Sequence, residues 1–146
     1  MKRHSSLAIL SREHHGALIL AQLLKKAAPE YKGLPTDIEG KADYASQFYR
    51  DELIKHFCEE EQVLIKKIKG INAHLDELGE EITKEHAELK AAFESIKSSN
   101  DLATHLDKLG RSLEQHIRKE EREFFPLIQE LCSEQLLLEI KQALSV

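Results

Sequence analysis

The scarcity of helix-breaking residues is the feature that most limits what this chain can fold into. The 146 residues include only 3 Pro and 6 Gly, and two of the prolines, Pro29 and Pro35, lie close together in one segment. Proline and glycine interrupt helices, so long stretches rich in Leu, Ala, Glu and Lys favour long helices over short strands and tight turns. The sequence therefore predicts an all-α fold.

Apolar residues recur at helical spacing in four long stretches, followed by one short stretch. The long helices are expected over about Ser6 to Ala28, Thr36 to Lys69, Asp76 to Lys97, and Asp101 to Pro126, and the short amphipathic helix from Ser133 onward. Short connections make consecutive helices antiparallel. We therefore expect an up-down-up-down antiparallel four-helix bundle with a short C-terminal helix, in one domain spanning residues 1–146.

Three local signals predict where helices begin and end. Thr36 followed by Glu39 has the form of a capping box, which opens the second helix. Gly70 suits the position just past a helix end, where φ is positive. Pro126 is expected to end or kink the fourth helix, because proline has no N–H and clashes with the preceding turn.

Charge and hydropathy exclude several classes of partner. The formal net charge is −5, and Lys and Arg are scattered among Glu, so nothing favours attraction to nucleic acid or to an anionic membrane. No apolar run approaches the ~20 residues that span a bilayer, and the N-terminal stretch does not resemble a secretory signal. We expect a cytoplasmic protein. Cys58 and Cys132 lack the spacing of a metal site and are expected to be free thiols.

A polar signature is repeated along the four long helices. The first and third helices each carry Glu-His, and the second and fourth each carry His-x-x-x-Glu-Glu. The residues concerned are Glu13-His14, His56 with Glu60 and Glu61, Glu85-His86, and His116 with Glu120 and Glu121. Two helical hairpins with the same signature are hard to attribute to chance.

The spacing brings these residues to one level of the predicted core. Residues four apart lie on one helix face, so His56 points the same way as Glu60, and His116 the same way as Glu120. Apolar neighbours place both pairs, and the histidines of the first and third helices, on the stripes that face the core. Counting residues from the connections at ~1.5 Å per residue puts them within about one turn of a common depth.

The ligand on the first helix is one of two adjoining residues. His14 lies closer to the apolar face than His15, and it matches Glu85-His86 in register. We take His14 as the predicted ligand, and the choice between the two is left to the structure.

Four buried imidazoles and two buried carboxylates are costly unless something pairs with them. A metal ion resolves this cost, because neutral His and ionised Glu are both ligands. Six protein ligands exceed what one structural Zn²⁺ takes, and mixed imidazole and carboxylate suits iron or manganese. Two carboxylates from different helices can each bridge two ions and leave coordination positions open. The neighbouring Glu59, Glu61 and Glu121 are expected to be solvated charges, with a role for Glu61 or Glu121 as hydrogen-bond acceptors around the ligands as the alternative.

These motifs together resemble the hemerythrin-like (HHE cation-binding) domain. The segment from Leu10 to His15 and the Phe124-Phe125-Pro126 end of the fourth helix are similar to bacterial members, and the resemblance covers nearly the whole chain. It implies two iron ions joined by an oxo or hydroxo bridge. It also implies ligation by His14, His56, His86 and His116, with Glu60 and Glu120 as bridging carboxylates.

The sequence departs from oxygen-carrying hemerythrins at two points. Those proteins have a second His one turn from the third-helix ligand, where this chain has Ile82 and Lys90. They also end with His-x-x-x-x-Asp, whereas here both Glu120 and Glu121 are glutamates. One ligand is thus missing or supplied differently, which favours a more open site over stable, reversible O₂ carriage.

The predicted function is a non-haem di-iron protein that binds, senses or reacts with O₂, peroxide or NO. The alternative is an iron storage or oxygen-binding module without catalysis. A third possibility is a metal-free bundle whose polar cluster is only hydrogen-bonded. The partner is expected to be a small diatomic or peroxide ligand, and the sequence leaves open whether the protein is an enzyme.

Overall fold

The computed structural model describes residues 2–145, and helices are the regular secondary structure of this range. The predicted all-α fold is confirmed. The α-helices are α1 (Ser5–Leu23), α2 (Ile38–Phe48), α3 (Ile54–Glu59), α4 (Lys66–Ile68), α5 (Ala73–Glu94), α6 (Leu102–Lys119), α7 (Phe125–Leu131) and α8 (Glu134–Leu144). Three π-helical turns, η1 (Tyr49–Leu53), η2 (Glu60–Ile65) and η4 (Glu120–Phe124), and one 3-10 turn, η3 (Ile96–Ser98), complete them.

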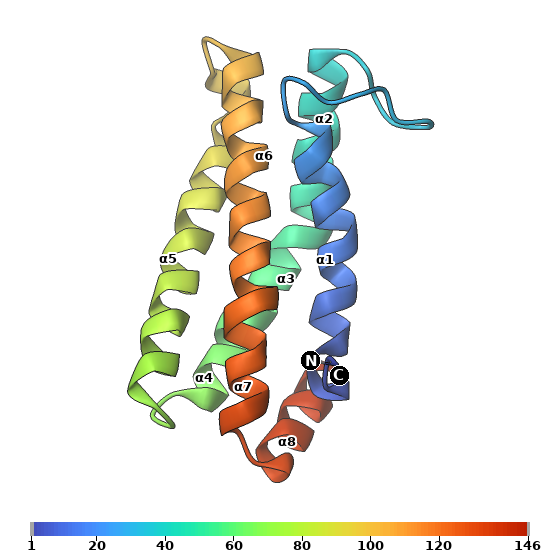
Figure 1. Ribbon diagram of the computed structural model, residues 1–146. Coiled ribbons are helices and arrows are strands. Elements are labelled where there is room, and N and C mark those ends of the chain that lie inside the picture. Colours follow the sequence, from blue (N-terminus) through green and yellow to red (C-terminus); the bar gives the residue numbers. More distant parts are fainter. Residues whose placement is uncertain (1, 146) are drawn as a thin grey trace.

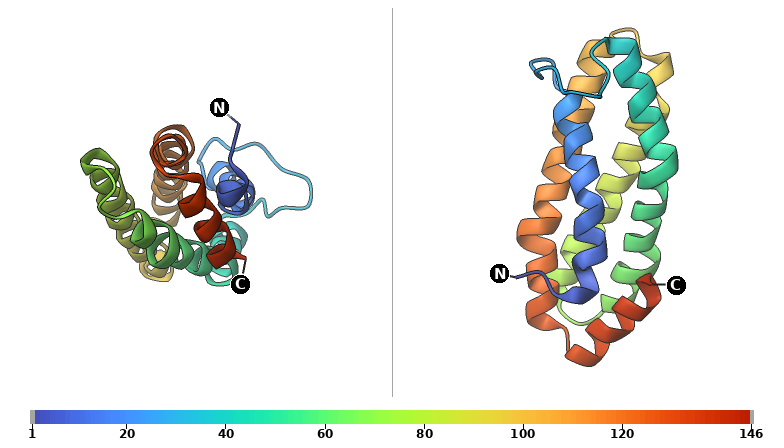
Figure 2. Two further views of the ribbon diagram at one scale, coloured as in Figure 1. Left: turned by 90° about the horizontal axis from the view of Figure 1, so that it is seen from below. Right: turned by 90° about the vertical axis from the view of Figure 1, so that its right-hand side faces the viewer.

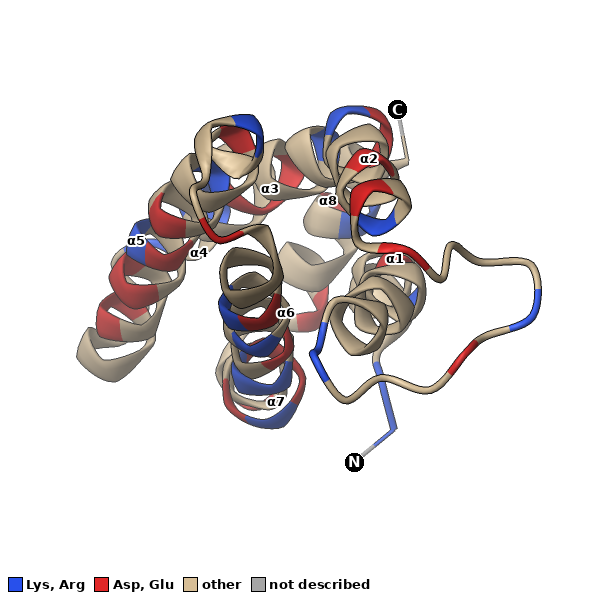
Figure 3. Cartoon of the chain, turned by 90° about the horizontal axis from the view of Figure 1, so that it is seen from above, with Lys and Arg blue, Asp and Glu red and all other residues tan. Residues whose placement is uncertain are grey.

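The helices form a bundle along one long axis, with α8 across its lower end (Figure 1). Seen from below, α8 crosses the ends of the other helices, and the connection between α1 and α2 projects to one side (Figure 2). α1 packs along α6, and α5 packs along the other side of α6. Acidic and basic residues are interspersed along α5 and α6 (Figure 3). No helix within residues 2–145 has the length and apolar character needed to cross a membrane.

Two long helical rods contain the π turns. The second predicted helix is one continuous rod from Ile38 to Ile68, and Gly70 beyond it has φ +89°, as expected for a glycine after a helix end. We call the four long helical stretches rods: α1, the rod Ile38–Ile68, α5, and a fourth rod that runs from Leu102 to Leu131 through α6, η4 and α7. Of the two expected effects of Pro126, an end of the helix is excluded, because the helix continues to Leu131; Pro126 lies in the first turn of α7, directly after the wide turn η4.

Side-chain caps decide where the helices begin. Asp37, not Thr36, caps α2, and its carboxylate accepts the N–H of Gly40 at 3.0 Å. The predicted capping box was therefore one residue out of place. Asn72 caps α5 in the same manner, and Ser133 caps α8, where the short helix was expected to begin.

The first helix ends five residues before the predicted end. α1 stops at Leu23, and the chain turns so that the N–H of Lys26 donates to the carboxylate of Asp107 on α6 at 2.9 Å. A hydrogen bond between two segments that are far apart in the sequence thus replaces the last turn of the predicted helix.

The apolar core is divided into two clusters at different levels of the bundle. The upper cluster includes Leu20 on α1 and Phe93 on α5, and the lower cluster includes Leu10 on α1 and Leu75 on α5. Helix α8 covers the lower cluster with Leu137, Ile140 and Leu144. On each long rod, the residues of the polar signature fall between members of the two clusters, so the fold surrounds a polar layer with apolar packing.

Gly110 lets α1 and α6 approach closely, and this generates a prediction. A Cβ at Gly110 would lie 2.6 Å from the carbonyl oxygen of Ala21 and 3.1 Å from the Cβ of Leu24. We expect Gly110→Ala to lower the free energy of unfolding by ~1–3 kcal/mol, measured by urea denaturation, because backbone must move to admit the methyl group.

Gly79→Ala on α5 is the matched control. There the new Cβ would meet Ile65 at an ordinary 3.4 Å, and alanine favours a helix over glycine by about 1 kcal/mol. A Gly110→Ala protein as stable as the Gly79→Ala protein would contradict the close helix crossing.

Candidate metal centre

The structure places all six predicted ligands side by side in the polar layer. Each is almost completely buried, with exposed fractions between 0% and 3%. Of the two adjoining histidines, His14 lies in the cluster, whereas His15 is exposed. The residues brought together are His14 on α1, His56 on α3, Glu60 at the start of η2, His86 on α5, His116 on α6 and Glu120 at the start of η4.

The Nε2 atoms of the four histidines face the two carboxylates at the centre. Glu120 Oε1 lies 3.0 Å from His14 Nε2 and 3.5 Å from His116 Nε2. Glu60 lies 3.3 Å from His56 Nε2 and 2.9 Å from His86 Nε2. The predicted same-face pairs at i and i+4 are thus confirmed as contacts.

The ligand atoms divide into two groups that share both carboxylates. His14 and His56 form one group with Glu60 and Glu120, and His86 and His116 form the other with the same two glutamates. Within each group the candidate atoms lie within 4.8 Å of one another. Each group offers two histidines and the two shared carboxylates, a donor set that can hold one metal ion. The two groups together can therefore hold two ions.

Most of these buried atoms lack a hydrogen-bond partner. His86 Nε2 donates to Glu60 at 2.9 Å, but the other inward-facing atoms do not reach hydrogen-bonding geometry despite their short separations. The unpartnered atoms are His14 Nε2, His56 Nε2, His116 Nε2, Glu60 Oε2, Glu120 Oε1 and Glu120 Oε2. Since buried polar atoms are almost always paired, their convergence at one point fits a cation at the centre.

Four further glutamates surround the centre and hold the outer nitrogen of each histidine. In each case Nδ1 hydrogen-bonds to a carboxylate of another helix, and a neutral imidazole that donates its Nδ1–H there turns its Nε2 lone pair inward. The pairs are His14 with Glu121 at 2.6 Å, His56 with Glu13 at 2.9 Å, His86 with Glu61 at 2.8 Å, and His116 with Glu85 at 2.7 Å.

These four hydrogen bonds form a closed ring around the bundle. Glu13 on α1 reaches the second rod, Glu61 reaches α5, Glu85 reaches α6, and Glu121 returns to α1. Glu61 and Glu121 thus take the alternative role of acceptors, and the expectation that they are solvated charges is wrong. Sequence reasoning missed the same role for Glu13 and Glu85, although the repeated Glu-His pair was the signal that marked them.

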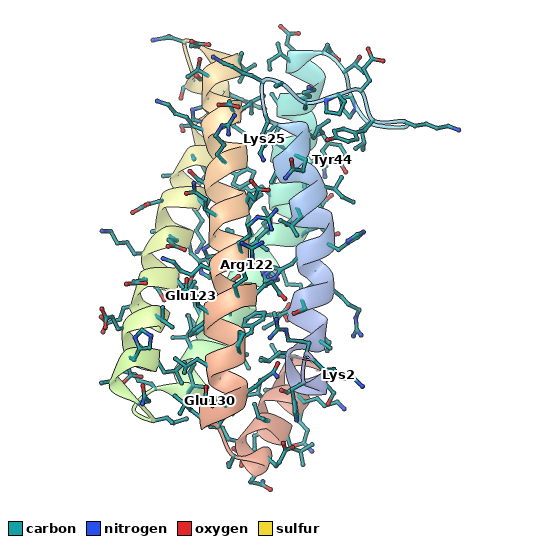
Figure 4. All side chains as sticks on the ribbon, viewed as in Figure 1. Lys2, Lys25, Tyr44, Arg122, Glu123 and Glu130 are labelled. Carbon is teal, nitrogen blue, oxygen red and sulfur yellow. The ribbon has the colours of Figure 1, made fainter. Side chains whose placement is uncertain are left out.

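Two of the three π turns, η2 and η4, begin at the two central carboxylates. Neighbouring residues of an α-helix diverge by about 100°, and a wider turn reduces this angle. At η2 and η4 the first residue (Glu60 or Glu120) faces the centre while the next (Glu61 or Glu121) still reaches a histidine of another helix. The following residues Arg122 and Glu123 lie on the outside of the rod (Figure 4).

Arg3 completes the wide turn before Pro126. The N–H of Phe125 donates to the carbonyl of Glu120, and Pro126 has no N–H to offer the carbonyl of Glu121. The Arg3 guanidinium donates to that carbonyl at 2.8 Å and to the side chain of Glu121 at 3.0 Å. It therefore holds the carboxylate that orients His14.

Comparison with protein-family models gives one match, to the hemerythrin HHE cation-binding domain, over residues 5–128. The chain belongs to this family. Searches of curated proteins and of solved structures found no match. The matched range contains all six residues of the centre and all four outer glutamates.

Aromatic rings pack against the histidines of this hemerythrin domain and shield them from water. Phe125 stacks on His14 with ring centroids 5.6 Å apart, and Phe57 stacks on His86 at 4.3 Å. Both phenylalanines are buried. The rings of His14 and His86 are thus held by packing on their faces as well as by hydrogen bonds at their edges.

The remaining histidines and cysteines lie outside the centre. His4 caps α1 and contacts Glu134, and His105 donates to the carbonyl of Ala92. Both cysteines are free thiols, as predicted, with Cys58 exposed and Cys132 buried.

Protonation of the centre follows from its buried charges. Burial lowers the pKa of His56, but the charge of Glu60 and the hydrogen bond to Glu13 outweigh it and raise that pKa to about 10. Burial raises the pKa of Glu60, yet the neighbouring histidines bring it well below the usual range. Burial and the charge of Glu60 raise the pKa of Glu120. Cation binding must therefore displace protons from the hemerythrin centre.

The metal-free protein is expected to lose stability as the pH rises above neutrality. The folded-state pKa of His56, about 10, lies above the ordinary value of 6.5 for a histidine. Its charged form therefore stabilises the fold fully below pH 6.5, and this contribution is lost as the pH rises through 10. Urea denaturation of the metal-free protein between these pH values measures the decline.

Two variants serve as controls for this pH dependence. His56→Gln should flatten the decline, whereas His74→Gln, at an exposed site, should leave it unchanged. A free energy of unfolding that stays constant or increases over this range would contradict the assignment.

Proposed function

We propose that this hemerythrin-domain protein binds two iron ions at the buried centre and uses them to bind, sense or react with O₂, peroxide or NO. The observation that carries the proposal is the pair of histidine groups that share Glu60 and Glu120. The His14/His56 group would hold one ion and the His86/His116 group the other, with both carboxylates bridging. Imidazole and carboxylate donors together suit iron.

When bound, iron supplies affinity for small oxygen- or nitrogen-containing ligands and the ability to exchange electrons with them. The chain's own residues orient and enclose the ions. The outer glutamates fix the tautomer and angle of each imidazole, and Phe57 and Phe125 exclude water from the histidine faces. Sealing the centre strengthens the electrostatic interactions inside it.

The donor count supports a site with room for a ligand. Ile82, one turn before His86, is apolar and completely buried. Lys90, one turn after His86, lies 3.8 Å from Glu61. Neither supplies a further histidine, and Glu121 is engaged with the outer nitrogen of His14. Each ion would then have four protein donors, fewer than the six of an octahedral site, which favours reaction or sensing over stable O₂ carriage.

We also propose that the four long rods run up-down-up-down, the order predicted from their short connections. Antiparallel neighbours let the residue beside each inner ligand reach the next rod at the same depth. The four hydrogen bonds between successive rods support that order.

Metal analysis tests the proposal directly. After anaerobic loading with Fe²⁺ and removal of excess metal, we expect two iron ions per chain. His14→Ala and His116→Ala should each reduce the content to about one, because each removes a ligand from a different group. His74→Ala should retain two. Less than one iron per wild-type chain would contradict the proposal.

Exposing the loaded protein to O₂ and then to peroxide separates the kinds of function. A persistent change in the visible absorption spectrum that reverses on deoxygenation would favour an oxygen-binding module. Continuous consumption of peroxide would favour an enzyme. Iron retained without any spectral response would favour storage.

A further inference from the structure

The centre is closed to solvent, so metal ions need a route to it. None of the six inner residues is more than 3% exposed, and apolar clusters lie above and below them. At the His14 corner the route is covered by Arg3, which contacts Glu121 and Gln129 and lies over the ring of Phe125. An ion must therefore enter between rods rather than along the axis of the bundle.

A pocket between α5 and α6 reaches a histidine of the centre from outside. It has a volume of about 260 Å³ and is lined by polar side chains that include Glu85, Glu88, Ser112, Gln115, His116 and Lys119. The unpartnered Nε2 of His116 belongs to a side chain that lines this pocket and also faces the central carboxylates. The pocket and the centre are thus separated by one imidazole ring and its outer glutamate.

The charge of this pocket suits a cation. Lys119 pairs with Glu85 at 2.5 Å and with Glu81 at 3.4 Å, and Glu88 lies in the same lining. Among the lining residues, two carboxylates (Glu85 and Glu88) and one ammonium (Lys119) give a net charge of −1, and Glu81 places a further carboxylate beside Lys119. Carboxylate, amide and hydroxyl oxygens can replace waters around a hydrated divalent ion, and lysine has a flexible stem that can move aside.

We propose that the pocket between α5 and α6 is the entrance through which divalent metal ions reach the centre. The inference rests on the proposed function, since it concerns the loading of the same ions. Glu88 and Gln115 make the first contacts at the surface. The ion then passes the Lys119–Glu85 pair and meets His116, the first ligand of the centre.

Co²⁺ is a suitable probe, because its visible absorption reports entry into the centre without any reaction with O₂. The experiment mixes the metal-free protein with Co²⁺ in a stopped-flow instrument and measures the final cobalt content separately. Glu88→Gln removes one charge from the pocket, and Ser112→Phe fills part of it. Both positions are exposed, so the fold is expected to tolerate both changes.

Each variant has a matched control. Glu77→Gln makes the same charge change at an exposed position of α5, about 16 Å along the helix from Glu88. Ser112→Ala changes the same position without filling the pocket. Neither control is expected to alter the rate of loading.

We expect Glu88→Gln to slow loading about threefold at low ionic strength, with a smaller effect in high salt, because charge steering is screened. Ser112→Phe should slow loading more strongly at every ionic strength. In both variants the final cobalt content should equal that of the wild type.

The outcomes distinguish the two proposals. Wild-type loading rates in both Glu88→Gln and Ser112→Phe, with full cobalt content, would overturn the entrance and leave the metal centre intact. A wild-type protein that takes up neither Co²⁺ nor Fe²⁺ would overturn the proposed function, and the entrance with it.

Discussion

Two carboxylates, Glu60 and Glu120, lie completely out of water in the middle of the bundle, and the surrounding structure serves to make this arrangement stable. An isolated buried charge is strongly unfavourable. Here four imidazoles surround the pair, and each imidazole is held from behind by another glutamate. Three of those outer glutamates in turn contact a basic side chain, Arg3, Lys90 or Lys119. Alternating charge thus extends from the interior to the surface in successive shells.

The backbone departs from regular α-helical geometry where two consecutive glutamates must both reach the interior. A regular α-helix cannot easily direct two consecutive residues toward the same interior region. The wide turns at η2 and η4 do so, and they begin at the two glutamates that need it. In η4 the cost is a carbonyl without a helical donor, which the guanidinium of Arg3 satisfies. Pro126 is therefore compatible with the rod, because the preceding turn and an external donor already replace its missing N–H.

The sequence predicted the six inner residues because their pattern is local: a spacing of four within a helix and apolar neighbours on the same face. The ring of outer glutamates was predicted only in part, as an alternative role for Glu61 and Glu121, since which carboxylate meets which histidine depends on the rotation of one rod against another. The role of Arg3 could not be predicted either, because it depends on a π turn more than a hundred residues away in the chain. Helix ends were misplaced where a tertiary contact competed with local capping, as with Lys26 and Asp107.

The ring also has a consequence for the order in which the protein folds. Three of its links join residues separated by 43, 25 and 31 positions, whereas the link from Glu121 to His14 spans 107. Contacts between segments that are far apart in the sequence have a larger entropic cost of loop closure and form more slowly. The His86/His116 group lies entirely within residues 60–120, so it can assemble before α1 docks. The His14/His56 group needs α1 in place, so we expect this half of the centre to be completed last.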